Sequence, residues 1–205
     1  MTPEYLDLAK RALSRRDPVM RAIIRRYPGI ALASRGDPFT TLARSIVGQQ
    51  ISVKAAQTVW GRINLALPEF TPAAVSRHGA SRLARCGLSR RKAEYFVDLA
   101  RHFNKGLLDH GAWQNMDDEE VIEDLVRVRG IGRWTSEMFL MFNLLRPDVL
   151  PLDDIGLQRA VSLHYFDGAR AGIAEIREVA EMWAPWRSVA TWYLWRSLDP
   201  VPVEY

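Results

Sequence analysis

The sequence predicts an all-α protein of about ten helices joined by short connections. Apolar residues recur at spacings of three and four along the chain, whereas the alternation typical of strands is almost absent. Asp-Pro or Thr-Pro pairs at 17–18, 37–38 and 71–72 mark helix starts, because the polar residue can cap and proline suits the first turn. With 205 residues, 48% of them hydrophobic, the chain can bury one sizeable core or two small lobes.

The first helix is expected to open at Tyr5, and the three Pro-marked helices follow it, the first of these ending before Pro28. Asp117 and Glu120 have the spacing of a capping box, which places another helix start there. The last residues, 199–202, read as a frayed tail. Apolar periodicity predicts the remaining helices over 53–63, 90–102, 135–145, 155–165, 175–183 and 186–197.

Composition excludes several classes of site. The single cysteine, Cys86, rules out an intramolecular disulfide framework and a four-cysteine zinc or iron–sulfur site, and the four histidines show no ligand spacing. A net charge of +4 favours a polyanionic partner. No apolar run reaches membrane-spanning length, so we expect a cytoplasmic protein without a membrane partner.

Gly130-Ile131-Gly132 separates two helical patterns. Glycine permits positive φ and leaves backbone N–H groups uncovered at the start of the next helix, where a phosphate can bind. Arg129 and Arg133 crowd the same turn. The alternative is an ordinary helical hairpin in which Gly130 only ends the first helix.

Asp153 and Asp154 precede the helix expected from Ile155. A carboxylate at this position can point into a site and stabilise the positive charge that develops on a sugar when its glycosidic bond breaks. The alternative is that one of these acids merely caps the helix, and the two roles are compatible.

Four linked motifs resemble the helix–hairpin–helix DNA glycosylase superfamily, in particular bacterial 3-methyladenine DNA glycosylase II. The resemblance implies two helical lobes with a cleft between them, in the compact form that lacks an N-terminal α/β domain. One lobe would span about 38–145, with the hairpin at 125–140, and the other about 1–37 plus 146–205. The four motifs are Leu42–Ala56, Gly130–Thr135, Leu152–Asp154 and Trp183–Ser188 continuing to Trp195.

The resemblance implies that Asp154 is the catalytic residue of a glycosylase acting on alkylated purines such as 3-methyladenine and 7-methylguanine. Bifunctional relatives carry a lysine just after the Gly-x-Gly-Arg turn, where this chain has Trp134. We therefore expect a monofunctional enzyme that leaves an abasic site. A different lesion, such as hypoxanthine or ethenoadenine, or a DNA-binding module without chemistry are the alternatives.

By the same resemblance, Trp134, Trp195 and Met138 would line the pocket for the extruded base, since electron-rich rings attract a cationic base. The loop after Gly48 would supply the side chain that fills the gap in the duplex. Gln50 has the corresponding position and Gln49 is adjacent. Either glutamine could plug the stack and hydrogen-bond the orphaned base.

The expected partner is duplex DNA containing damaged bases, bound by a monomer associated with the nucleoid. No cofactor is required and no iron–sulfur cluster is expected. The backbone carbonyls of Val126, Val128 and Gly130 would hold a structural Na+ or K+ at the hairpin. The expected contacts to the DNA backbone are Gly130, Gly132, Arg129, Arg133, Thr135, Ser89 and Lys92.

Overall fold

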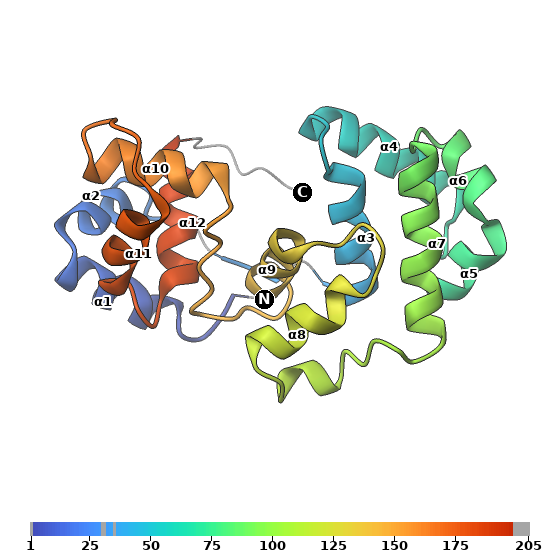
Figure 1. The fold of residues 1–205 in the computed structure, drawn as a ribbon, viewed down its shortest axis with the longest axis horizontal. Coiled ribbons are helices and arrows are strands. Elements are labelled where there is room, and N and C mark those ends of the chain that lie inside the picture. Colours follow the sequence, from blue (N-terminus) through green and yellow to red (C-terminus); the bar gives the residue numbers. More distant parts are fainter. Residues whose placement is uncertain (1, 30–31, 35, 199–205) are drawn as a thin grey trace. The chain divides into compact units, whose positions relative to one another are not determined.

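The computed structural model describes residues 2–29, 32–34 and 36–198 (Figure 1). Over these residues it has twelve α-helices, one short 3-10 helix and no strand, which confirms the all-α prediction. The tail expected at 199–202 lies outside the described residues. The helices separate into two compact units, each of which has its own core.

The first unit holds the described residues up to 34 and from 140 onward. Its core contains Trp183, which is fully buried and lies against Tyr165 with ring centroids 5.9 Å apart. The indole of Trp183 (3.0 Å) and the hydroxyl of Tyr165 (2.5 Å) both donate to Oδ2 of buried Asp17. The helices of this unit are α1 (Leu6–Arg16), α2 (Pro18–Arg26), α10 (Ile155–Tyr165), α11 (Ile173–Glu181) and α12 (Arg187–Leu198).

The second unit holds the described residues from 36 to 139. Its longest helix, α7 (Arg90–Asn104), contacts α3, α5 and α6 (Figure 1). Its core is aromatic, with Phe39 stacked on Phe70 at 5.2 Å and Trp113 edge-on to Phe139 at 5.2 Å. The other helices are α3 (Pro38–Gly48), α4 (Val53–Ala66), α5 (Pro72–His78), α6 (Ala80–Arg85), the 3-10 helix η1 (Ala112–Gln114), α8 (Asp118–Val126) and α9 (Arg133–Phe142), whose last three residues count with the first unit.

The helix starts expected from Pro pairs and the capping box are confirmed. The side chains of Asp17, Asp37 and Thr71 accept from backbone N–H groups two or three residues ahead. At α8, Glu120 N donates to Asp117 Oδ1 (2.9 Å) and Asp117 N donates to Glu120 Oε2 (2.8 Å). Local capping chemistry therefore sets where these helices begin.

Some boundaries differ from expectation. Two short elements, α6 and η1, were not predicted, because they are too brief to show a periodicity. Helix α11 begins earlier than expected, since Glu175 Oε2 accepts from Gly172 N at 2.6 Å and so caps the preceding turn. Helix α9 runs over Arg133–Phe142 instead of 135–145, and Leu145 has a left-handed φ of 55° that a helix cannot contain.

Candidate functional site

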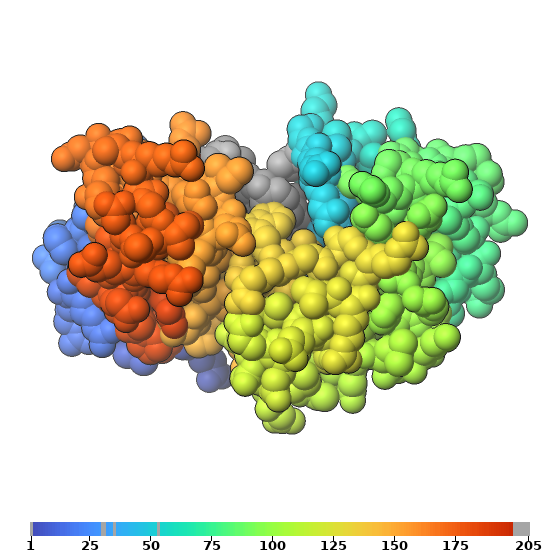
Figure 2. Space-filling model, viewed as in Figure 1, coloured from blue at the N-terminus to red at the C-terminus, as the bar shows by residue number. Residues whose placement is uncertain are grey.

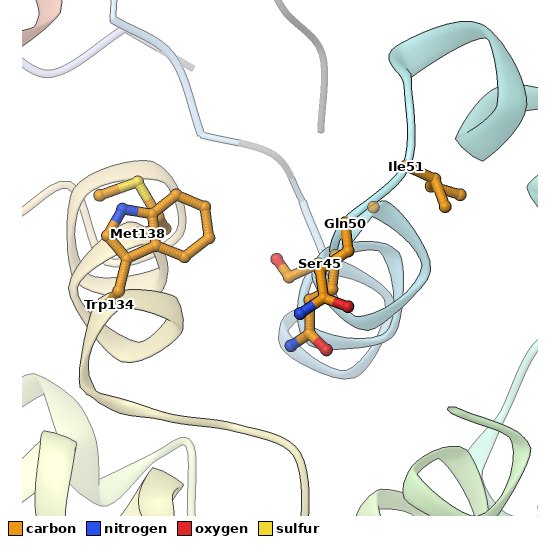
Figure 3. Close-up of a pocket in the computed structure, with 7 residues that line it drawn as sticks. Ser45, Gln50, Ile51, Trp134 and Met138 are labelled. Atoms are coloured by element: carbon orange, nitrogen blue, oxygen red, sulfur yellow. The ribbon is translucent and has the colours of Figure 1, made fainter. Parts of the chain in front are cut away.

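A cavity of about 270 Å³ lies in the second unit, beside the loop that joins α3 to α4. The indole of Trp134 and the thioether of Met138 lie next to each other on α9, opposite Ser45 and Gln50 (Figure 3). Residues four apart share one face of a helix, which explains why these two side chains reach the same cavity. The lining residues are Ser45, Gly48, Gln49, Gln50, Ile51, Trp134 and Met138.

The two glutamines of this loop have different environments. Gln49 is half-buried, and its Nε2 donates to the carbonyl of Gly130 at 2.8 Å. Gln50 is exposed and has a left-handed φ of 58°, a conformation that costs a non-glycine residue about 1–2 kcal/mol. Of the two side chains proposed for the duplex gap, only that of Gln50 is solvent-exposed.

The two glycines of the hairpin also differ in their surroundings, one lying against a side chain and the other being exposed. Gly130 has φ of 86°, and a Cβ there would lie 2.1 Å from the ring of Tyr95. A Cβ on Gly132 would meet nothing within 4 Å, and the residue is exposed. The fold therefore requires glycine at 130, whereas the free protein has room for a side chain at 132.

The hairpin segment, yellow in Figure 2, reaches the surface in that view. Its arginines Arg129 and Arg133 are exposed but are engaged by carboxylates. Arg133 donates to Glu119 Oε2 at 2.8 Å and to Glu137 Oε1 at 3.1 Å. The hydrogen bonding of its guanidinium to Glu119, followed by the charge of that carboxylate, raises the pKa of Arg133 above its usual value. Arg129 forms a longer ion pair with Glu94 at 3.5 Å.

The remaining backbone-contact predictions lie at helix starts. Ser89 is exposed and caps α7, accepting from Lys92 N at 3.2 Å. The ammonium of Lys92 donates to the carbonyls of Val47 (2.7 Å) and Gln49 (2.6 Å), and burial lowers its pKa. Thr135 is only 4% exposed, so little of this residue is accessible to a phosphate in the free protein.

The carbonyls expected to hold a monovalent cation already take part in the hairpin. Val128 O accepts from Ile131 N at 3.1 Å, and Gly130 O accepts from Gln49 Nε2 at 2.8 Å. A carbonyl oxygen has two lone pairs and is a ligand type that hard cations prefer, so the donor chemistry of Val126, Val128 and Gly130 fits such an ion. Among the described residues, no cluster of His, Cys, Asp and Glu side chains could hold a metal.

In the first unit, Asp154 is the residue that caps α10. Its Oδ1 accepts from Leu157 N at 2.6 Å and from the indole Nε1 of Trp195 at 2.7 Å. Asp153 is exposed and does not cap the helix. Two donors therefore orient the Asp154 carboxylate. The capping bond from Leu157 N by itself would restrain the carboxylate less.

Two residues around this carboxylate were not identified from the sequence. A Cβ on Gly156 would lie 3.0 Å from both Asp154 Oδ1 and Trp195 Nε1, so glycine leaves room for their hydrogen bond. Phe142 stacks on Trp195, with ring centroids 6.0 Å apart and an angle of 25° between the planes. A glycine two residues after a candidate catalytic acid is the one sequence signal that could have been followed.

The predicted site residues thus fall into two groups. Gln49, Gln50, Trp134 and Met138 line one cavity of the second unit, beside the hairpin residues of the same unit. Asp154 and Trp195 are hydrogen-bonded in the first unit. None of the described helices has the length and apolar character needed to cross a bilayer.

Comparison with known proteins adds the family. DNA-3-methyladenine glycosylase 1 of Schizosaccharomyces pombe is 32% identical over 168 residues, covering 78% of this chain and 72% of its own. A DNA-3-methyladenine glycosylase of Bacillus subtilis is 28% identical over 212 residues, covering 97% of this chain and 67% of its own. The chain spans about two thirds of the length of the Bacillus subtilis relatives.

Solved structures of proteins with similar names have similar folds. The Schizosaccharomyces pombe 3-methyladenine DNA glycosylase in complex with abasic DNA has a TM-score of 0.81 at 27% identity, covering 96% of this chain and 98% of its own. A DNA-3-methyladenine glycosidase from Bacillus halodurans has a TM-score of 0.78 at 33% identity, covering 89% and 90%. Residues 43–185 match the family of HhH-GPD superfamily base excision DNA repair proteins. The chain belongs to the HhH-GPD superfamily of base excision DNA repair proteins.

Proposed function

We propose that the chain is a monofunctional DNA glycosylase that extrudes alkylated purines of the 3-methyladenine and 7-methylguanine type from duplex DNA and releases them by hydrolysis. The observation that carries this proposal is the carboxylate of Asp154, held by Leu157 N and by the indole of Trp195. The names of the relatives support the substrate class.

Asp154 supplies the negative charge that the reaction needs. As the N-glycosidic bond breaks, the deoxyribose gains oxocarbenium character, which an oriented carboxylate stabilises at no cost of reorganisation. The same carboxylate can orient or deprotonate the attacking water. A cationic alkylated purine leaves easily, so a second carboxyl to protonate the leaving group is unnecessary.

Aromatic stacking from Trp134 and Trp195 is the proposed source of preference for a cationic base, worth about 0.5–2 kcal/mol for each cation–π contact. Met138 contributes a polarisable surface to the cavity beside Trp134. Because Trp134 has the position at which bifunctional relatives carry lysine, no amine is available there to attack the sugar. The product is an intact abasic site.

DNA binding is assigned to the backbone of the hairpin. The N–H groups at the start of α9 can bind a phosphate without side-chain charge. A Na+ or K+ on the carbonyls of Val126, Val128 and Gly130 would add positive charge beside that phosphate. The partner is damaged duplex DNA, and the enzyme is proposed to act as a monomer on the nucleoid of the cytoplasm.

The test compares Asp154→Asn with Asp153→Asn on duplexes that carry defined lesions, with abasic sites revealed by alkali. Asparagine is also a good capping residue, so the first variant should fold. We expect base release to fall at least about 100-fold for Asp154→Asn and to stay near wild type for Asp153→Asn. DNA binding should survive in both variants.

Other results would change the proposal in defined ways. Equal release by wild type and Asp154→Asn would remove Asp154 as the catalyst. Binding without release by wild type would indicate a DNA-binding module, and release of hypoxanthine or ethenoadenine alone would replace the substrate class. Strand breaks before alkali would contradict the monofunctional assignment.

A further inference from the structure

One face of α7 contacts both connections that are assigned to DNA. Lys92, Tyr95 and Asp98 follow one another at spacings of three along this helix, which places them on one side. Lys92 reaches the last turn of α3 through the carbonyl of Val47 (2.7 Å) and the loop after α3 through the carbonyl of Gln49 (2.6 Å). The first of the three residues therefore contacts the loop at residues 49–52, which we call the wedge loop.

The other two residues of this face reach the hairpin. The ring of Tyr95 lies against Gly130, where a Cβ would approach it to 2.1 Å. Asp98, which is 7% exposed, accepts from the backbone N–H of Arg129 at 2.9 Å and from the side chain of Arg101. The backbone of the hairpin is therefore fixed to the same helix that holds the wedge loop.

A direct bond closes this arrangement. Gln49 Nε2 donates to the carbonyl of Gly130 at 2.8 Å, so that the wedge loop and the hairpin are tied to each other as well as to α7. Gln50, the next residue, has a left-handed backbone conformation, which a glutamine rarely adopts. The bonds to the carbonyls on either side of Gly48 restrain the backbone that leads into Gln50.

The resemblance predicts that Lys92 contacts the DNA backbone. Its ammonium is instead engaged by two carbonyls of its own protein, and its side chain is half-buried. We propose that Lys92 is a positioning residue that, with Tyr95 and Asp98, makes α7 a common support for the wedge loop and the hairpin. The wedge is then held at a set distance from the phosphate that the hairpin binds. This proposal rests on the proposed function, because it concerns the extrusion of a base.

The first experiment uses the free protein and needs no activity. Lys92→Met removes the ammonium group and keeps a long, unbranched side chain. The control, Lys105→Met, makes the same change at an exposed lysine just after α7. We expect amide hydrogen exchange over residues 46–51 to become at least roughly tenfold faster in Lys92→Met, since these bonds restrain the loop. The Lys105→Met variant should exchange as wild type does, and unchanged exchange in Lys92→Met would overturn the proposal.

The second experiment separates positioning from charge. A lost phosphate contact lowers the slope of log affinity against log salt by about one, whereas a lost positioning residue leaves this slope unchanged. We expect Lys92→Met to bind undamaged duplex with the wild-type slope and to release a paired lesion roughly 10- to 100-fold more slowly in single turnover. A lowered slope with a normal rate would show that Lys92 is a phosphate contact and would overturn the proposal.

Rescue distinguishes positioning from a general loss of stability. A lesion placed opposite an abasic site is cheaper to extrude than a paired one. Release by Lys92→Met should recover toward wild type on this substrate, whereas Asp154→Asn should not recover. Failure of rescue would count against the positioning role. If wild type released no base from any substrate, the proposed function would fail, and the exchange experiment alone would decide the role of Lys92.

Discussion

The hairpin and the turn at Asp153 and Asp154, which we call the acid turn, are both short connections that end where a helix begins. The hairpin is proposed to act through its backbone, and the acid turn through a side chain. At the acid turn the working group is a side chain, the carboxylate of Asp154, which two donors orient. At the hairpin the nearby arginine side chains pair with carboxylates of the protein, and the first turn of α9 carries no acidic residue. An external anion at the hairpin would therefore be bound mainly by backbone N–H groups.

This difference predicts where substitutions matter. At the hairpin, the presence of a Cβ should decide the outcome, because a Cβ blocks approach to the backbone. At the acid turn, the effect of a substitution should depend on whether it displaces the Asp154 carboxylate or removes one of its hydrogen-bond donors.

Gly130→Ala should lower the free energy of unfolding by about 2–5 kcal/mol, since it combines a positive φ with a clash against Tyr95. Gly132→Ala should change this free energy by less than about 0.5 kcal/mol. It should nevertheless weaken DNA binding by about tenfold or more, the value of a lost hydrogen bond to a charged group. Denaturant titration and binding to an abasic duplex measure the two effects.

Gly61→Ala is the matched control, because Gly61 is exposed on α4 and a Cβ there meets nothing within 4 Å. It should leave DNA affinity unchanged. If Gly132→Ala bound DNA as tightly as wild type, the backbone at this position would not approach a phosphate.

Gly156→Ala tests the acid turn without changing either partner of its hydrogen bond. The new Cβ would meet Asp154 Oδ1 and Trp195 Nε1 at 3.0 Å, so the carboxylate or the indole must shift by a few tenths of an ångström. We expect the single-turnover rate of base release to fall roughly 10- to 100-fold, with the affinity for DNA unchanged. A wild-type rate would show that the reaction tolerates displacement of the carboxylate.

Trp195→Phe should give the smallest of the three effects. Phenylalanine keeps a ring against Phe142 but removes the Nε1 donor to Asp154. Loss of one hydrogen bond to a carboxylate corresponds to about tenfold in rate, if the bond serves catalysis. A rate loss confined to cationic lesions would instead assign Trp195 to stacking alone, and comparison of a cationic with a neutral lesion separates the two.

The sequence was sufficient where the signal is local. Helix starts at Asp17, Asp37 and Asp117 follow from capping residues. A cap at Asp153 or Asp154 was also expected, and the structure places it at Asp154. The family followed from motifs that occur in order along the chain. Each cap, and each motif taken by itself, depends on residues close to one another in the sequence.

Contacts between distant segments could not be read in this way. Trp195 and Asp154 are 41 residues apart, and Gln49 and Gly130 are 81 apart, so no periodicity relates them. The sequence offered both glutamines as the wedge, and the structure distinguishes their environments by the bond from Gln49 to the hairpin and by the exposure of Gln50. The resemblance placed Lys92 near the DNA backbone, whereas its two acceptors in the structure lie 43 and 45 residues earlier in the sequence.

The left-handed backbone of Gln50 has a consequence for how stability and activity can vary in this protein. Glycine would adopt φ of 58° without steric cost, so replacing Gln50 by glycine would relieve strain in the folded chain. The same replacement would delete the side chain that is proposed to occupy the opened duplex. At this position the relief of backbone strain and the proposed wedge role would therefore favour different residues.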